Sequence, residues 1–423
     1  MDKNTVIGFV LIAAIVIGFT WLNKPSEEEL KRQQRYNDSI ALVQQKQVEQ
    51  EQADSSRLKD QAKDSVALSD TTAITQKADA FGAFSASAFG AEKFYELENE
   101  YLTLKISNKG GRIYSVNLKN YHTYDSLPLM LFDKDESAFN YIFSTNNNRV
   151  VNSADLFFEP VGGVVKDEKG KQTLTLRLKT TDPKAYVDFI YTLAPKDYMV
   201  NYALRAVGMN TIMPANTNSL ELQWKSKIRQ QEKGRKFEEQ YSAIHYKYLS
   251  DDPEKLSNNK DEQKEISNKM KWVSFKDQFF SSIFIADQEF LSATLASNVE
   301  KNQLSPYLKY YNADLIIPFD PTGKTQSNFK FYFGPNQYKI LSAYDKGVPA
   351  EQKLKLRSVI PLGWGVFGWI NRFVIIPMFN FFSLFLSSFG IIILLMTIVI
   401  KLVLFPLTYK SYMSGAENAS TQA

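Results

Sequence analysis

The chain has 423 residues, which is enough for two or three domains. Its 50 lysines and arginines nearly balance 46 aspartates and glutamates, so a net charge of +4 gives no reason to expect a nucleic acid or an acidic polymer as partner. Cysteine is absent and the histidines are His122 and His245, which excludes disulfides, thiolate sites, cysteine nucleophiles and multi-histidine metal sites. We therefore expect neither a metal nor a cofactor.

The first apolar run is VIGFVLIAAIVIGFTWL, residues 6–22, which carries no charge. A helix of this length spans about 25 Å, just enough to cross the apolar core of a bilayer. A cleaved signal peptide is the alternative, but its apolar region is usually about 7–15 residues long and small residues follow it. The run ends in aromatic and bulky residues, so we expect an uncleaved membrane anchor over residues 1–24.

Residues 25–90 are rich in glutamine, glutamate, lysine, aspartate and serine. Isolated apolar residues in such a composition cannot bury a core of their own. We expect a polar tether, either a solvated helix or a disordered segment.

Residues 91–345 have the alternating pattern of a β-rich domain. The spacing of the strands predicts a large antiparallel sandwich. The charged stretch 227–270 interrupts the pattern, and we interpret it as a long surface excursion. The strand signals are YLTLKIS, then RIYSVNLKNY after an NKGG turn, TLTLRLKTT, AYVDFIYTLA, YMVNYALRAVGM, SSIFIADQEF, DLIIPFD and KFYFGP.

The chain becomes apolar and aromatic again after Val359. Trp369, Phe373 and Ile376 fall on one helical face, with polar residues off that face, as in a helix that lies in the membrane interface. A spanning helix is the alternative, and the polar interruptions count against it. We assign residues 346–386 to a connecting and interfacial region.

The second convincing span is FGIIILLMTIVIKLVLFPL, residues 389–407, within a membrane segment of 387–409. Pro406 is expected to mark the end of its helix. Lys401 lies about 9 Å along the helix from the end of the run. Its amine either reaches the headgroups along the lipid or faces a water-containing cavity within the membrane. Thr397 lies one turn earlier on the same face and would line the same wall.

These residues carry a resemblance to a known family. The order of anchor, tether, β domain, interfacial helix and span resembles the YidC membrane protein insertases of Gram-negative bacteria (the YidC/Oxa/Alb family). Lys401 stands where an arginine is common in the family, and the proline pattern after it is similar. The similar stretches, within residues 1 to about 414, are NKGGRIYSVNLKNY (108–121), KWVSFKDQFF (271–280), FYFGPNQYKIL (331–341) and IVIKLVLFPLTYKSYMS (398–414).

The resemblance implies a protein with no catalytic chemistry. Family members hold a hydrophilic groove among five membrane helices, and the groove lowers the cost of moving polar segments of nascent membrane proteins across the bilayer. By this resemblance Lys401 is the cation of the groove and Thr397 lines its wall, while lysine in place of arginine loses bidentate contacts. The implied partners are nascent membrane proteins and the lipid bilayer, with the Sec translocon and the ribosome as further candidates. The implied location is the bacterial inner membrane, crossed more than once, with a large periplasmic domain.

The resemblance also implies a periplasmic β-supersandwich like that of sugar mutarotases, followed by an incomplete insertase core of α-helices. A carbohydrate- or peptide-binding domain tethered to the membrane is therefore the alternative function. A mutarotase needs a histidine and a glutamate in one pocket, which two histidines make hard to satisfy. Tyr241, Tyr246 and Tyr248 are candidates for a sugar- or peptide-binding surface, although packing is the more ordinary use of such side chains.

The chain departs from the family after Ser414, where GAENASTQA stands in place of a basic stretch, a cytoplasmic hairpin and further membrane helices. One choice of synonymous codons for these nine residues, read one base later, encodes Ala-Gln-Lys-Met-Arg-Val-Leu-Arg-Pro, which is similar to the family's basic stretch. We expect residues 410–423 to be an aberrant tail produced by a frameshift, with an unrelated tail as the alternative. One helix cannot enclose a groove, so we expect this chain not to insert proteins although its full-length parent does.

Overall fold

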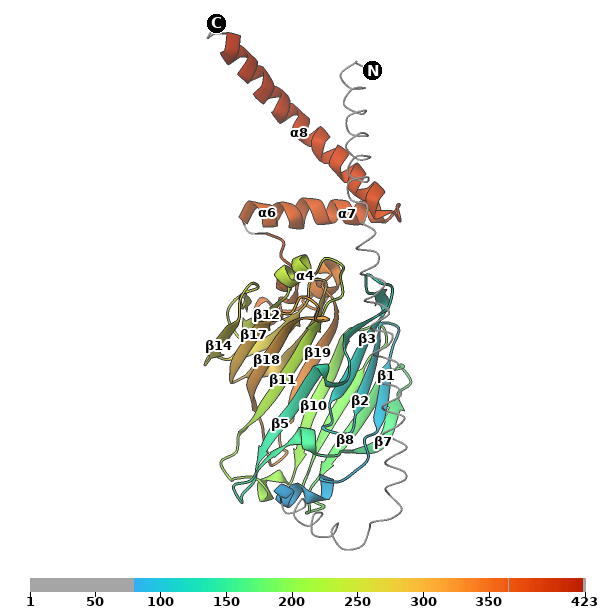
Figure 1. Ribbon diagram of the computed structural model, residues 1–423, viewed down its shortest axis with the longest axis vertical. Helices are drawn as coiled ribbons and strands as arrows, with labels where there is room; N and C mark the ends of the chain where they lie inside the picture. The colour runs from blue at the N-terminus through green and yellow to red at the C-terminus, as the bar shows by residue number, and fades with distance from the viewer. Residues whose placement is uncertain (1–79, 364, 421–423) are drawn as a thin grey trace. The chain divides into compact units, whose positions relative to one another are not determined.

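The computed structural model describes residues 80–363 and 365–420 (Figure 1). The predicted anchor and most of the predicted tether lie outside the described residues. Every pairing among the described strands is antiparallel, and the strands form three sheets. In spatial order, these are a sheet of β1 (Phe94–Glu98), β2 (Leu102–Ser107), β3 (Ile113–His122) and β4 (Pro128–Phe132); a sheet of β13 (Glu254–Lys255), β12 (Ala243–Tyr248), β15 (Met270–Lys276), β16 (Phe280–Phe290), β19 (Ser327–Pro335), β10 (Met199–Val207), β9 (Tyr186–Leu193), β8 (Gln172–Lys179) and β7 (Glu159–Lys166); and a sheet of β14 (Glu262–Ile266), β17 (Ser292–Val299), β18 (Tyr307–Pro318), β11 (Ser219–Arg229), β5 (Ser137–Ser144) and β6 (Val150–Asn152).

Helices are short within the β domain and longer after it. The domain carries the α-helices α4 (Arg235–Tyr241) and α5 (Tyr338–Ala343) and the 3-10 helices η1 (Gly82–Ser87), η2 (Lys134–Glu136), η3 (Ser153–Asp155), η4 (Met209–Thr211), η5 (Ala350–Gln352) and η6 (Leu356–Val359). The C-terminal helices are α6 (Gly365–Ile370), the π-helical turn η7 (Asn371–Ile375), α7 (Ile376–Ser383) and α8 (Phe389–Ser420).

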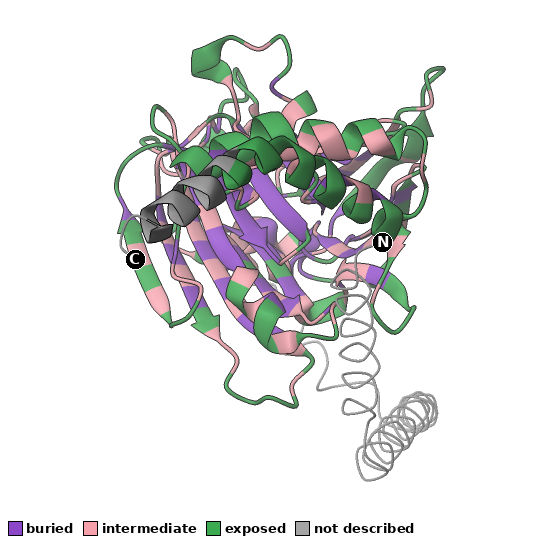
Figure 2. Ribbon diagram, turned by 90° about the horizontal axis from the view of Figure 1, so that it is seen from above, coloured by how far each residue is buried: buried purple, intermediate pink, exposed green. Residues whose placement is uncertain are grey.

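The core of the β domain lies between facing sheets and is rich in aromatic rings. Trp224 of β11 stacks on Phe275 of β15 with 3.8 Å between ring centroids, and Phe139 of β5 meets Phe284 of β16 at 5.3 Å. These pairs join the six-stranded sheet to the nine-stranded sheet, which confirms the predicted sandwich. Figure 2 shows the buried residues concentrated on the inner strands. Alternation explains the layer, because successive side chains of a strand point to opposite faces.

The NKGG turn between β2 and β3 is confirmed. Gly110 and Gly111 have φ of +76° and +64°, in the left-handed region that glycine tolerates best. A Cβ on Gly111 would lie 2.8 Å from the ring of Phe189, so this position also needs the absence of a side chain.

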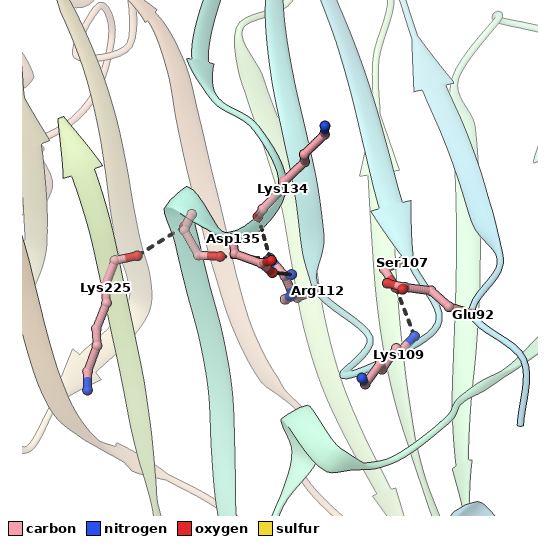
Figure 3. Close-up of polar contacts among 8 residues, drawn as sticks. Glu92, Ser107, Lys109, Arg112, Lys134, Asp135 and Lys225 are labelled. Atoms are coloured by element: carbon pink, nitrogen blue, oxygen red, sulfur yellow. Dashed lines mark hydrogen bonds and ion pairs between the residues drawn. The ribbon is translucent and has the colours of Figure 1, made fainter. Parts of the chain in front are cut away.

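Arg112, directly after this turn, ties the four-stranded sheet to β5 (Figure 3). Its guanidinium donates to the carbonyls of Lys134 and Ser137 at 3.0 and 2.7 Å, and it lies 3.0 Å from the carboxylate of Asp135. The Ser137 hydroxyl continues the link by donating to the carbonyl of Lys225 in β11 at 3.1 Å. The turn that carries part of the family resemblance is therefore a joint between sheets.

The structure corrects the prediction for residues 227–270. The interval begins in β11 and carries α4, β12, β13 and β14, and Tyr246 and Ile244 of β12 are fully buried. It is not a surface excursion, because β12 is an inner strand paired with β15 on one side and β13 on the other.

The packed β domain also extends beyond both of its predicted ends. Phe84, assigned to the tether, is fully buried and lies 5.3 Å from the ring of Phe143. Leu356 and Val359, assigned to the connecting region, are fully buried in the same core. The packed domain therefore reaches further in both directions than residues 91–345, because short 3-10 helices contribute single apolar side chains that no periodic pattern announces.

Two segments are long and apolar enough to cross a membrane by length and composition, Gly365–Ser383 and Phe389–Pro406. Their mean hydropathies are 1.3 and 2.6. The first combines α6, η7 and α7, and the π-helical turn begins at Asn371, whose side chain donates to the carbonyl of Leu362 at 2.8 Å. That residues 364–388 lie in the interface stays a prediction.

Candidate functional site

Lys401 and Thr397 lie on one face of α8, as their spacing of four residues requires. Both side chains are exposed, and the Thr397 hydroxyl donates to the carbonyl of Ile393 at 2.8 Å. Among the side chains that the structure describes, no carboxylate pairs with Lys401. Its neighbours on the same face, Leu404 and Phe405, are 47% and 63% exposed, so the cation lies in an apolar surface. The groove role of Lys401 and Thr397 stays a prediction.

The prediction that Pro406 ends the helix is wrong, because α8 continues through it to Ser420. Proline removes one backbone N–H, the donor to the carbonyl of Leu402, but the helix continues on both sides of this single lost bond. The 32 residues of α8 make a helix about 48 Å long, well beyond the predicted span.

A large cavity lies where α4, β12, β13 and η6 meet. Its volume is about 630 Å³, and its wall includes Tyr241, His245, Glu254, Lys255, Lys276 and Pro361. Tyr246, proposed with Tyr241 and Tyr248 for a binding surface, is instead fully buried in the core. The residues that line the cavity are mainly polar, and Lys255 and Lys276 make the wall basic.

Two buried lysines hold the C-terminal end of α4 beside this cavity. Lys276 of β15 donates to the carbonyl of Tyr241, and Lys309 of β18 donates to the carbonyls of Ser242 and Asn258 at 2.6 and 2.5 Å. Cations at a helix C-terminus satisfy carbonyls that have no partner in the helix. Burial lowers the pKa of each lysine to about 8.

A buried pair of carboxyl groups supports the other side of α4. The Glu238 carboxyl group accepts hydrogen bonds from the backbone N–H of Gln231 and of Glu232 at 2.8 and 3.1 Å. Burial raises the pKa of Glu238 and of Asp277, and the charge of Asp277 raises the pKa of Glu238 further. The Ser242 hydroxyl donates to Asp277 Oδ1 at 2.8 Å. The raised pKa of Glu238 favours its neutral form, so the pair carries less than its formal charge.

His245 and Glu254 line the same cavity, although His122 does not. Burial, with the nearby lysines, lowers the pKa of His245 to about 3, so its imidazole is neutral. Glu254 accepts from the Tyr246 hydroxyl at 2.5 Å and pairs with Lys264 at 3.0 Å, and both contacts lower its pKa. The ionised Glu254 could serve as a base, but the neutral His245 has no imidazolium proton to donate, so this pair does not supply both the acid and the base that sugar epimerisation needs.

Sequence reasoning missed this buried charge cluster. The alternation in AIHYKY (243–248) was the available signal for β12, but the surrounding charges favoured a surface assignment. The burial of Lys276 and Lys309 follows from acceptors on α4 and the segment after it, which are distant in sequence, and no local pattern reports that.

Comparisons with known proteins agree on one family. Residues 95–377 match the family model described as the YidC periplasmic domain. A protein of Parabacteroides distasonis named "Membrane protein insertase YidC" is 44% identical over 420 residues, which is 99% of this chain and 65% of the relative. A Bacteroides fragilis protein of the same name is 41% identical over 417 residues, covering 99% of this chain and 64% of the relative. The chain thus spans about 65% of the length of the curated relatives it matches.

Two solved structures are also similar in part. One is described as an active YidC insertase with the first transmembrane domain resolved, at 12% identity and a TM-score of 0.35, covering 81% of this chain and 64% of that one. The other is a galactose mutarotase related enzyme from Lactobacillus acidophilus, at 10% identity and a TM-score of 0.36, covering 57% of this chain and 97% of that one. Scores at this level support no conclusion about this chain.

The family match covers more than half of the 423 residues, and relatives with the same family name align along 99% of the chain. The observed sandwich and the apolar helices after it agree with that match. The chain belongs to the YidC family and carries that family's periplasmic domain.

Proposed function

We propose that the complete protein assists the insertion and folding of membrane proteins in the bacterial inner membrane and catalyses no chemical reaction. The observation that carries this proposal is the 44% identity, along 99% of the chain, to a relative named "Membrane protein insertase YidC". The apolar helices at the C-terminal end support a role at the membrane.

Lys401 is the residue that we propose to act on the substrate. A charged side chain in the middle of a membrane helix costs about 2.5–3.5 kcal/mol on insertion scales, so a protein gains by surrounding it with water or polar groups. A cation held in such a space attracts acidic and polar segments of a nascent chain and lowers the cost of moving them. Thr397 extends the polar face by one turn, and further helices of the complete protein close the groove.

The proposed topology places the β domain in the periplasm and α8 across the membrane, with additional spans. The substrates are nascent membrane proteins and the surrounding partner is the lipid bilayer. We propose the Sec translocon and the ribosome as further partners, and no nucleic acid.

A chimera tests the role of Lys401. Residues 1–414 of this chain replace the matching part of the Parabacteroides distasonis relative, and the chimera is expressed in cells depleted of their own insertase. We expect Lys401→Arg to support growth and Lys401→Leu to fail, because only the first keeps the charge. Val403→Leu, on the opposite face of α8, is the matched control and should grow normally.

Growth of Lys401→Leu equal to that of the parent chimera contradicts the proposal. That result indicates that the amine of Lys401 reaches the lipid headgroups and not a groove. It favours the alternative function, a carbohydrate- or peptide-binding domain tethered to the membrane.

A further inference from the structure

The cavity beside α4 is lined by two lysines, Lys255 and Lys276, that form no ion pair with a carboxylate among the described residues. Lys276 is 2% exposed, and among the described residues its ammonium donates to one acceptor, the carbonyl of Tyr241. An ammonium group has three donors, so two of them are left for what occupies the cavity. Lys255, at the rim, has Asn258 Oδ1 at 2.9 Å as its hydrogen-bond acceptor, an uncharged group.

The acidic groups nearby are already engaged. Glu254 lines the cavity, but Lys264 and the Tyr246 hydroxyl hold its carboxylate. Asp277, the next residue in the chain, attracts the ammonium of Lys276, but burial raises the pKa of Asp277 and its Oδ1 already accepts from the Ser242 hydroxyl at 2.8 Å. The cavity wall, with Lys255 and Lys276 against Glu254, therefore carries a net positive charge, and a buried cation that is only partly balanced is costly unless an anion joins it.

His245 adds a neutral donor to the same wall. Among the described residues, no group forms a hydrogen bond with its imidazole, and burial together with the charges of Lys276 and Lys255 lowers its pKa to about 3. A neutral imidazole has one N–H, which can donate to an oxygen atom of an anion without adding another buried charge.

The chain itself places this cavity near the membrane segment. Pro361 belongs to the cavity wall and precedes Gly365, the first residue of α6, by four residues. Four residues span at most about 14 Å. The helix that begins there exposes large apolar side chains, among them Phe367 at 70% and Trp369 at 59%. Pro361 in the cavity wall is thus at most about 14 Å from the start of α6, a helix suited to the surface of a bilayer.

We propose that this cavity is a binding site for a phosphoryl group, held by the ammonium groups of Lys255 and Lys276 and by the imidazole N–H of His245. A phosphoryl group presents several acceptor oxygens and carries the charge that the wall lacks. The volume of about 630 Å³ exceeds what a bare phosphate fills, so it admits a glycerophosphate headgroup as well. The source is a phospholipid or a soluble phosphate, and the two are separated by experiment.

The full chain, labelled with ¹⁵N only at histidine and held in uncharged maltoside micelles, provides the assay. It contains two histidines, so each imidazole gives its own NMR signal and His122 serves as an internal control. The probes are inorganic phosphate, phosphatidylglycerol added to the micelles, and diacylglycerol, which lacks the phosphoryl group. We expect the His245 signal to shift with phosphate or with phosphatidylglycerol, and the His122 signal to stay unchanged.

Two variants locate the site. Lys255→Gln removes an exposed cation with little structural consequence and should weaken binding about tenfold, the usual effect of losing one contact between charged groups. Lys271→Gln is the matched control, because Lys271 is a half-buried lysine that lines a different cavity and donates to the carbonyl of Asp287 at 2.6 Å.

A shift with phosphatidylglycerol but not with diacylglycerol supports the site and identifies a lipid source. A shift with inorganic phosphate alone supports the site and identifies a soluble source. The proposal is overturned if neither probe moves the His245 signal, if diacylglycerol moves it equally, or if Lys255→Gln binds as tightly as Lys271→Gln.

Discussion

The neutral His245 makes the stability of the β domain depend on pH. Its imidazole has a pKa of about 3 in the folded protein, against an ordinary value near 6.5 in the unfolded chain. Since the folded-state pKa is the lower one, the stabilising contribution is complete above pH 6.5 and is lost as the pH falls toward 3. Each pH unit in that interval corresponds to about 1.4 kcal/mol, so the loss at about pH 5 is roughly 2 kcal/mol.

Urea unfolding of the full chain in maltoside micelles measures this contribution. The buried Trp224 and Trp272 report on the β domain by fluorescence. The unfolding free energy of the wild type should fall by about 2 kcal/mol more than that of His245→Gln between about pH 7.5 and pH 5, because glutamine cannot take up the proton. His122→Gln, which changes an exposed histidine, should keep the full pH dependence of the wild type.

Identical pH dependence for His245→Gln and the wild type refutes the reasoning. It means that the imidazole is protonated as easily in the folded protein as in the unfolded chain, and hence that the basic wall around it does not exist as described.

Two further changes test the packing of the β domain in the same unfolding assay. Asp188→Asn should lower the unfolding free energy by about 2 kcal/mol, because the fully buried carboxylate holds Arg177 at 2.8 Å and Arg205 at 2.6 Å, and both arginines are partly exposed; an unchanged urea midpoint contradicts this. Gly111→Ala should cost about 3 kcal/mol, from left-handed backbone strain and the clash with a buried ring. Gly162→Ala is its control, since φ is +75° there but nothing lies within 4 Å, and an equal effect of both changes excludes the clash.

Alternation predicts the strands of the β domain well, because each strand buries one face. The predicted YLTLKIS and TLTLRLKTT segments are β2 and β8, with Leu104 and Leu176 fully buried on their inner faces. The surface assignment of β12 was wrong because it followed the charges of the segment: Lys247 is 3% exposed, and its ammonium donates to the carbonyl of Tyr248. Charge favours the surface only when no acceptor is at hand, and the acceptors here come from the folded backbone.

Part of the candidate site could likewise be predicted from the sequence, and part could not. Helical spacing places Thr397 and Lys401 on one face from sequence alone, and α8 confirms that geometry. The cavity around His245 could not be anticipated, because Lys255, Lys276 and Pro361 come together only through strand pairing and the return of the chain at η6. Pro406 was given too much weight, since one missing donor does not terminate a long apolar helix.

Site-specific photocrosslinking to a nascent membrane protein tests the central claim about Lys401 most directly. A photoreactive residue is placed at position 397 or 404 of the chimera, four residues before and three residues after Lys401 on its face of α8, or at position 403 or 399 on the opposite face. The account predicts crosslinks to the nascent chain from 397 and 404 and to lipid from 403 and 399. Crosslinks from 397 and 404 to lipid alone, or equal crosslinking of the nascent chain from both faces, contradict it.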